Sequence, residues 1–336
     1  MIEACAMAAA FLAAMLVGWA MRRAGIIDLP NDRSNHESPT PRGGGLGILA
    51  GFFIALALFP VLPPASGAML AGLVLCAGAA GGLGLLDDLF TLSERFKFLA
   101  LALLGLALAA LTGPVTNLGF SLPWTVGLLG SALWVFTTAN AVNFMDGSDG
   151  LIAAALIPAS LALALIGGPE TIWACLALAA ALAGFAVWNA PLARARGVVF
   201  AGDAGALGAA VIFAGLAIRI AATGPAGTAW LAPLLILPLL GDVLLTMAAR
   251  VKAGEPVFSA HRAHAYQLLI RTGMSHRRVA LIWAGLGLGC GALALIGAAG
   301  PAIVKFAVFA IGVAGFVLFH RLVRSRAAAA GEDVRR

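Results

Sequence analysis

Charged residues are scarce in this sequence: Asp, Glu, Lys and Arg make up only 11% of its 336 residues. Soluble globular domains are about a quarter charged, so the composition excludes an ordinary soluble protein. Cysteine is also rare, and each of the four stands alone in an apolar stretch, which excludes the C-x-x-C spacing of zinc and redox sites. The net charge of +6 comes without a basic domain or a groove-binding motif, so nucleic acid is excluded as a partner.

Apolar residues dominate instead, at 62% of the sequence. They occur in blocks of about 18 to 22 residues, which are long enough to cross the hydrocarbon core of a bilayer. We therefore predict an all-α integral membrane protein, a polytopic bundle of about eleven transmembrane helices, with one transmembrane domain over residues 1–322 and a basic tail over 323–336. The predicted spans are approximately 4–21, 44–62, 67–86, 97–113, 124–143, 150–167, 170–188, 204–222, 229–249, 279–298 and 302–320.

The basic residues predict the orientation of these spans. They gather in alternate loops, for example Arg22 and Arg23 after the first span and Arg194 and Arg196 after the seventh. Such loops are cytoplasmic by the positive-inside rule. An odd number of spans then places the N-terminus outside and the C-terminus in the cytoplasm. Because no basic residue precedes the first apolar block, we expect an uncleaved span there rather than a signal peptide.

The segment that ends at Gly150 places an amide or a carboxylate at every third position: Asn140, Asn143, Asp146 and Asp149. It lies at the end of a predicted membrane helix. Polar and ionisable groups are costly near hydrocarbon, so their clustering here indicates a functional site. Two alternatives remain open, namely that the amides bond to a neighbouring helix and that Asp149 caps the next helix.

A pair of carboxylates, Asp87 and Asp88, ends the third predicted span. The C-terminus of a helix carries negative partial charge, and adjacent carboxylates repel each other. The pair therefore indicates a bound cation or a role in proton transfer. The alternative is a solvated helix end that is balanced by Arg95 and Lys97.

Three further groups have open interpretations. Asp203 precedes the eighth span and could be an N-cap, His261 and His264 could belong to a solvated loop, and the run Gly43–Gly47 could be flexible or could let backbone amides approach phosphate. Yet nearly all carboxylates and four of the five histidines fall on the predicted cytoplasmic side. Acidic residues contribute little to topology, so this distribution predicts a cytoplasmic active-site face.

Together these segments resemble, in the same order, the motifs of the polyprenyl-phosphate N-acetylhexosamine-1-phosphate transferases, the bacterial glycosyltransferase family 4. The histidine loop resembles that of the O-antigen-type initiating enzymes. Four features depart from what is usual in the family. Ser148 and Ala206 replace the usual residues, and an apolar run from Phe98 stands where a polar residue is common. The histidine loop has two histidines where some members have three. These departures leave the choice of sugar open. The resembling segments are Asp28–His36 with Pro39–Gly45, Asp87–Asp88, Asn140–Leu151, Phe200–Gly205 and His261–Gln267.

The resemblance implies transfer of N-acetylhexosamine-1-phosphate from a UDP-sugar to polyprenyl (undecaprenyl) phosphate, with release of UMP, at the cytoplasmic face of the bacterial inner membrane. The product would start a lipid-linked glycan such as O-antigen. The resemblance also implies Mg²⁺, with Mn²⁺ as a substitute, bound by Asp203 and Asn143, and it is compatible with a homodimer. Catalytic roles would fall on Asp87, Asp88, Asp146 and His264, and substrate-binding roles on Asn140, Asp149, His261, Arg262 and Arg42.

A secondary transporter is the competing interpretation, since it too would be polytopic and would carry carboxylates. Transporter sites lie near the bilayer midplane, where Asp242 is the one carboxylate that we expect. The ordered cytoplasmic motifs therefore favour the enzyme. A non-catalytic membrane scaffold would explain none of the polar clusters.

Overall fold

The computed structural model describes residues 2–24, 27–28, 40–59, 64–192, 194–256 and 261–335. A short antiparallel pair joins β1 (Ile27–Asp28) to β2 (Thr40–Pro41). The side chain of Asp28, and all of Asp32 and His36 in the first motif, lie outside the described residues. The principal helices are α1 (Ile2–Ala24), α2 (Leu46–Ala57), α3 (Pro64–Phe90), α4 (Glu94–Thr112), α5 (Trp124–Phe144), α6 (Leu151–Ile166), α7 (Ile172–Asn189), α8 (Gly202–Thr223), α9 (Leu231–Leu235), α10 (Leu237–Lys252), α11 (Ala265–Arg271), α12 (His276–Ala298) and α13 (Ala302–Ala329).

Each of the eleven predicted spans contains a helix, which confirms the all-α class and gives the chain the helices of an integral membrane protein. Within the described residues, eight helices are long and apolar enough to cross a membrane, and a bent pair raises the number to nine. The remaining two stretches form the apolar but shorter helices α2 and α6, of 12 and 16 residues.

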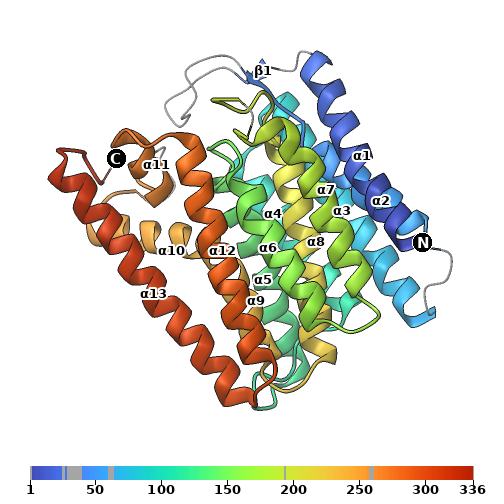
Figure 1. The fold of residues 1–336 in the computed structure, drawn as a ribbon. Helices are drawn as coiled ribbons and strands as arrows, with labels where there is room; N and C mark the ends of the chain where they lie inside the picture. Colours follow the sequence, from blue (N-terminus) through green and yellow to red (C-terminus); the bar gives the residue numbers. More distant parts are fainter. Residues whose placement is uncertain are drawn as a thin grey trace.

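Helix α8 forms the centre of the bundle (Figure 1). Within its membrane-length window, 94% of the residues are buried, and it packs against α3 and α5. Its sequence is rich in glycine and alanine, which let neighbouring backbones approach closely. The outer helices α1 and α13 instead expose large apolar side chains such as Leu16 and Leu318, as expected for helices in contact with lipid.

The predicted span 229–249 is a broken helix rather than a straight one. A 3₁₀ turn, η1 (Thr228–Trp230), leads into α9, and this segment meets α10 at an angle of 76°. Pro233 and Pro238 flank the break at Ile236. Proline lacks a backbone N–H and clashes with the preceding turn, so two prolines five residues apart prevent a continuous helix. As a result α10 lies crosswise to α12 and α13 (Figure 1).

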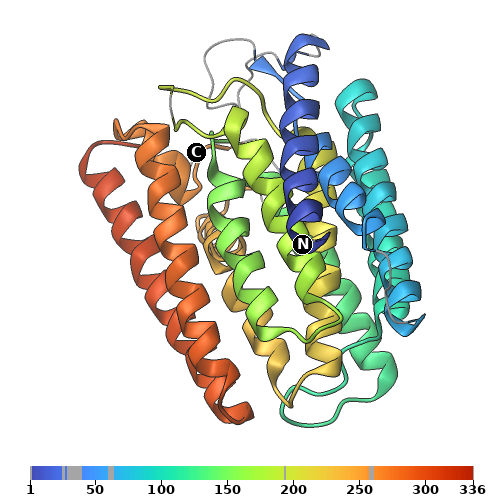
Figure 2. The same cartoon turned by 45° about the vertical axis from the view of Figure 1, so that its right-hand side comes forward.

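One end of the bundle gathers the polar loops, and we call it the loop end. It holds β1, α11, the last turns of α3 and α5, and the first turn of α8 (Figures 1 and 2). The motifs identified in the sequence meet at this end, so their one-sided distribution is a property of the fold.

The predicted tail 323–336 starts inside α13, which continues to Ala329. Beyond the helix, three arginines hold the chain. Arg324 donates to the carbonyl of Val334 (2.8 Å), Arg271 forms an ion pair with Glu332 (2.6 Å), and Arg250 donates to the carbonyl of Arg335. These arginines belong to α13, α11 and α10, so residues 332–335 tie three helices together at the loop end.

Candidate active site

The glycine-rich segment after β2 lies against the start of α8. The amide of Gly44 donates to the carbonyl of Phe200 (2.9 Å), and the amide of Gly45 donates to that of Ala201 (3.1 Å). A methyl group on Gly205 would overlap the backbone of Gly45, and the reverse is also true. Close packing of two backbones therefore accounts for these glycines, and it fixes the segment next to the end of α3.

The paired aspartates lie near the end of α3, and each has its own cation. Lys97 Nζ lies 2.8 Å from Asp87 Oδ2, while the amide of Leu92 donates to Asp87 Oδ1 (2.7 Å). Arg42 Nη1 lies 3.2 Å from Asp88 Oδ1. The side chains of Asp87 and Asp88 are only 11% and 5% exposed. Lys97 thus pairs with Asp87 as the alternative interpretation expected, but Arg42 rather than Arg95 lies beside Asp88, and both carboxylates are largely buried.

Asp203 joins these carboxylates from the first turn of α8. Asn143 Nδ2 donates to its Oδ2 (3.3 Å), so two residues that are 60 positions apart in sequence touch here. Asp87 lies beside Asp203 within reach of a side-chain hydrogen bond. Helix α8 begins at Gly202 without a side-chain cap. The alternative that Asp203 is an N-cap is therefore wrong.

Asp146 occupies the turn that follows α5, and its Oδ2 accepts a hydrogen bond from the amide of Gly202 (3.1 Å). Burial, followed by the negative charges of Asp203 and Asp88, raises the pKa of Asp146 well above its usual range. A carboxyl group in this position is under electrostatic repulsion that a bound cation would relieve.

The site holds more acidic than basic side chains, because two cations, Arg42 and Lys97, face four carboxyl groups whose full ionisation would leave them unbalanced. Oxygen donors of this kind suit Mg²⁺, which keeps several waters and needs only one or two protein carboxylates beside a substrate phosphate. Among the described residues, no three His, Cys, Asp or Glu side chains form a complete metal site by themselves. We call the four acidic residues the carboxylate cluster: Asp87, Asp88, Asp146 and Asp203.

Asp149 is buried just before α6 and faces a histidine that the sequence did not single out. His276 Nδ1 lies 3.5 Å from Asp149 Oδ2 and 3.1 Å from the hydroxyl of Ser148. Gly150, with φ of +76°, is the N-cap of α6, so the alternative that Asp149 caps this helix is wrong. His276 begins α12, and a single histidine at a helix start offers no sequence signal of such a role.

Two further amides bond to backbone groups near the site. Asn140 Nδ2 donates to the carbonyl of Phe136 (2.8 Å) within α5. Asn189, which the sequence analysis also missed, accepts from the amide of Gly150 (2.9 Å) and donates to the carbonyl of Val199 (3.0 Å). Asn189 thereby links the third motif to the segment that leads into α8.

The histidine loop approaches the third motif through Tyr266, the single tyrosine of the chain. The hydroxyl of Tyr266 lies directly against Gly147, and the charge of Asp146 is near enough to act on it. The rings of His261 and His264 have centroids 4.9 Å apart. His264 is 6% exposed, so this loop is not simply a solvated one.

The structure thus brings most of the predicted site residues to the loop end. Direct contacts connect Arg42, the carboxylate cluster and Asn143. Asn140 and Asp149 contact Phe136 and His276, so they act beside the cluster rather than in it. The loop of His261, Arg262 and His264 is attached through Tyr266.

Comparison with known proteins agrees with this arrangement. Residues 70–221 match the family described as "Glycosyl transferase family 4". This stretch contains the paired aspartates, the third motif and Asp203, that is, the whole carboxylate cluster.

Similar proteins also match over most of the chain. A decaprenyl-phosphate N-acetylglucosaminephosphotransferase of Mycobacterium leprae is 30% identical, and the match covers 82% of this chain and 78% of that protein. An undecaprenyl-phosphate alpha-N-acetylglucosaminyl 1-phosphate transferase of Yersinia pestis is 27% identical over 89% of this chain and 84% of its own length. The protein of the same name in Escherichia coli K12 is 28% identical, and the match covers 76% of this chain and 72% of that protein.

Proposed function

Because the chain belongs to the glycosyl transferase family 4, we propose that it transfers N-acetylhexosamine-1-phosphate to a polyprenyl phosphate, the kind of transfer for which its relatives are named. The carboxylate cluster with its two basic partners carries this proposal. The transporter interpretation gains no support, because Asp242, on which it rested, is bound by the backbone of the histidine loop.

In the proposed reaction, an oxygen of the polyprenyl phosphate attacks the phosphorus that bears the sugar in a UDP-N-acetylhexosamine. A P–O–P bond forms, the bond to the uridine phosphate breaks, and UMP leaves with the electron pair of that bond. Both reactants are anionic, so charge neutralisation and alignment dominate the barrier. Arg42 and Lys97 pair with carboxylates in the structure, and substrate phosphates would compete for the same two cations.

The paired aspartates suit the lipid side of the reaction. They lie near the end of a membrane-length helix, which is the level at which the phosphate of an embedded lipid lies. We assign Asp87 to orienting the lipid phosphate or accepting its proton, and Asp88 to holding Arg42 beside it. The buried contacts of Asp87 with Lys97 and Leu92 keep its carboxylate in one orientation.

Asp203 and Asn143 are the proposed ligands of Mg²⁺, with Mn²⁺ as a substitute. Bound there, the ion would neutralise the diphosphate of the donor and align it for in-line attack. The surplus of carboxyl groups in the carboxylate cluster, and the mutual repulsion that contributes to the high pKa of Asp146, support a cation at this place. The side-chain N–H of Asn143 donates to the Asp203 carboxylate. The side-chain oxygen of Asn143 would then be the second ligand of the ion.

The remaining residues suit the soluble donor. The histidine loop lies at the loop end of the bundle. Three of its residues would contact the diphosphate or the sugar: His261, Arg262 and His264. Asp146, the member of the carboxylate cluster whose charge acts on Tyr266, would complete the catalytic group. Asn140 and Asp149 would shape the uridine pocket from α5 and from the turn after it.

The proposed site faces the cytoplasm of a bacterial inner membrane, in a chain of eleven spans with its N-terminus outside. Single cysteines in a cysteine-free background should show this. A cysteine at Arg95, exposed at the loop end, should resist a membrane-impermeant thiol reagent in intact cells, whereas one at Asn117, exposed at the opposite end, should react. Labelling of the Arg95 variant from outside would contradict a cytoplasmic active site.

One assay tests the proposed function. Purified protein in detergent is supplied with undecaprenyl phosphate and UDP-N-acetylglucosamine, and UMP release is measured together with transfer of labelled sugar to the lipid fraction. Omission of the lipid phosphate should abolish both signals. A protein that produces neither UMP nor labelled lipid with any UDP-N-acetylhexosamine would contradict the proposal, and a screen of such donors identifies the sugar.

The contact between Tyr266 and Gly147 gives a further prediction. In Gly147→Ala the added methyl group would overlap the Tyr266 hydroxyl and lie 3.2 Å from Cζ. The third motif or the histidine loop must then move, and a displacement of about 1 Å in an active site lowers activity by roughly 100-fold. UMP release should fall by that order.

Removal of the hydroxyl should reverse this effect, so Gly147→Ala with Tyr266→Phe should be more active than Gly147→Ala alone. Gly82→Ala is the matched control, since no atom lies within 4 Å of an added methyl group there. Equal activity of the single and double variants would show that this contact does not position the site.

A further inference from the structure

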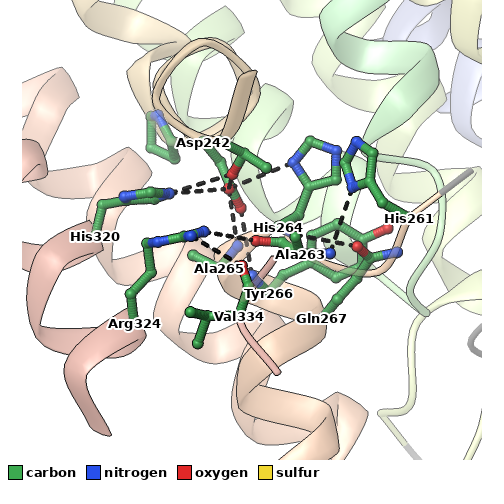
Figure 3. A network of polar contacts seen from close by, with 12 residues as sticks. Asp242, His261, Ala263, His264, Ala265, Tyr266, Gln267, His320, Arg324 and Val334 are labelled. Carbon is green, nitrogen blue, oxygen red and sulfur yellow. Dashed lines mark hydrogen bonds and ion pairs between the residues drawn. The ribbon is translucent and has the colours of Figure 1, made fainter. Parts of the chain in front are cut away.

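Asp242 is a buried carboxylate for which the proposed reaction has no role. It lies in α10 with 0% of its surface exposed. Figure 3 shows its side chain pointing from α10 at the histidine loop. A buried carboxylate is strongly destabilising unless charged and polar partners surround it. The identity of those partners therefore indicates what the residue does.

Backbone amides of the histidine loop hold the Asp242 carboxylate in one position. Asp242 Oδ1 accepts a hydrogen bond from the amide of Ala265 (2.8 Å), and Oδ2 accepts one from the amide of Tyr266 (3.3 Å). The hydroxyl of Thr246, one turn along α10, also donates to Oδ1 (3.1 Å). The two amides belong to the residues directly after His264, so the carboxylate is held in register with that histidine.

The same oxygen faces two imidazole rings. His264 Nδ1 lies 3.5 Å from Asp242 Oδ1, and Nε2 of His320, from α13, lies 3.8 Å away. An imidazole nitrogen next to a carboxylate is the one that carries the proton, which leaves the other nitrogen, here Nε2 of His264, to contact a ligand. At 3.5 Å this contact is an electrostatic one, and the buried Nδ1 of His264 has no hydrogen-bond partner among the described residues. The charge of Asp242 therefore favours the tautomer of His264 that carries its proton on Nδ1.

Further contacts limit rotation of the His264 ring. The ring of Tyr266 stacks beside it, with centroids 6.0 Å apart and an interplanar angle of 16°. Trp283 packs edge-on against Tyr266 and donates to the carbonyl of Pro238 in α10 (2.9 Å). Arg324 donates to the carbonyl of Ala263, immediately before the histidine (3.3 Å).

From these contacts we infer that Asp242 is a positioning residue, which holds His264 in one tautomer and one orientation, with Nδ1–H toward the carboxylate and Nε2 toward the donor substrate. The inference rests on the proposed function, because it presumes that His264 contacts the nucleotide sugar. It also explains the broken helix, since the crosswise course of α10 brings Asp242 to the loop (Figures 1 and 3).

The kinetic test uses Asp242→Asn, which keeps the size of the side chain and removes its charge. Loss of a group that orients a metal-bound histidine lowers activity by roughly 10- to 100-fold. We expect a loss of the same order in kcat/KM for the UDP-sugar, while the KM for the lipid phosphate stays unchanged. Thr112→Val is the control for loss of a buried polar contact, because the Thr112 hydroxyl donates to the carbonyl of Leu108 at the far end of α4.

A structural role alone would also lower activity, and a double-variant cycle separates the two explanations. In a His264→Gln background, Asp242→Asn should cause no further loss of kcat/KM, because its effect passes through the histidine. A loss of the same size with and without His264 would mean that Asp242 only stabilises the fold, and the inference would be wrong.

A second readout does not depend on turnover. Nitrogen NMR of protein labelled in its histidines reports which ring nitrogen carries the proton, and the His264 signal is the one lost in His264→Gln. We expect a protonated Nδ1 in the wild type and loss of that preference in Asp242→Asn. A wild-type ring protonated at Nε2 alone would overturn the inference.

The two readouts also separate this inference from the proposed function. A wild-type protein that lacks UMP release but shows the Asp242-dependent proton on Nδ1 would refute the function and support the positioning. The opposite result would be an active protein in which Asp242→Asn changes neither the protonated ring nitrogen of His264 nor the kinetics with the UDP-sugar. It would support the function and refute the positioning.

Discussion

Replacement of Asp203 by Asn is expected to lower UMP release by about a thousandfold, the equivalent of about 4 kcal/mol of lost charge stabilisation at a metal-assisted reaction centre. The amide has the shape of the carboxylate and still accepts from Asn143, so the change removes charge rather than packing. Repulsion from Asp87 and Asp88 falls at the same time. Thermal stability without metal should therefore be at least that of the wild type.

Metal removal should reproduce this result in the unchanged protein. EDTA should stop UMP release, and Mg²⁺ or Mn²⁺ should restore it in the wild type but not in Asp203→Asn. Glu170→Gln is the matched control, because it removes a carboxylate that pairs with Arg219 (2.7 Å) outside the site. Full activity of Asp203→Asn, or wild-type activity that survives EDTA, would remove the metal from the proposal.

Replacement of Asp87 by Asn is expected to lower kcat by about 10²- to 10⁴-fold, the usual contribution of a group that moves or holds a proton in the transition state. The KM for the UDP-sugar should change little if Asp87 acts on the lipid phosphate, as we propose. A group used only in the transition state affects kcat and kcat/KM together. Steady-state kinetics with each substrate varied in turn measure these parameters.

The ion pairs of Lys97 supply the control for this variant. Glu94 also pairs with Lys97 (3.2 Å), but its side chain is 60% exposed, and exposed pairs of this kind contribute about 0 to 1 kcal/mol. Glu94→Gln should therefore behave almost as the wild type. A large rise in the donor KM that is confined to Asp87→Asn would move Asp87 to the donor side and contradict the assignment.

The helices were predictable because the bilayer imposes a length on apolar segments, and each predicted stretch does contain a helix. Hydropathy alone, however, does not predict the angle at which a helix bends. The stretch 229–249 reads as one apolar block, although its prolines produce two helices at 76°. The short α11 was likewise not expected, because seven residues are too few for a helical pattern to stand out.

Residue types in the site were predictable, but most of their direct contacts were not. The resemblance placed Asp203 and Asn143 at one metal site, and the packing of α5 against α8 shows that their side chains touch. His276 is distant in sequence from Asp149, and Asp242 precedes Ala265 by 23 positions. Such contacts are set by how helices pack, which local sequence patterns do not record.

Residues 332–335 have a consequence for shortened variants of this chain. Arg271 and Arg324 contact this segment, and the same two side chains donate to the carbonyls of Arg262 and Ala263 in the histidine loop. The contacts of the carboxylate cluster with α5 and α8 involve none of these arginines. A chain that lacks residues 332–335 should therefore loosen the histidine loop and leave the carboxylate cluster in place.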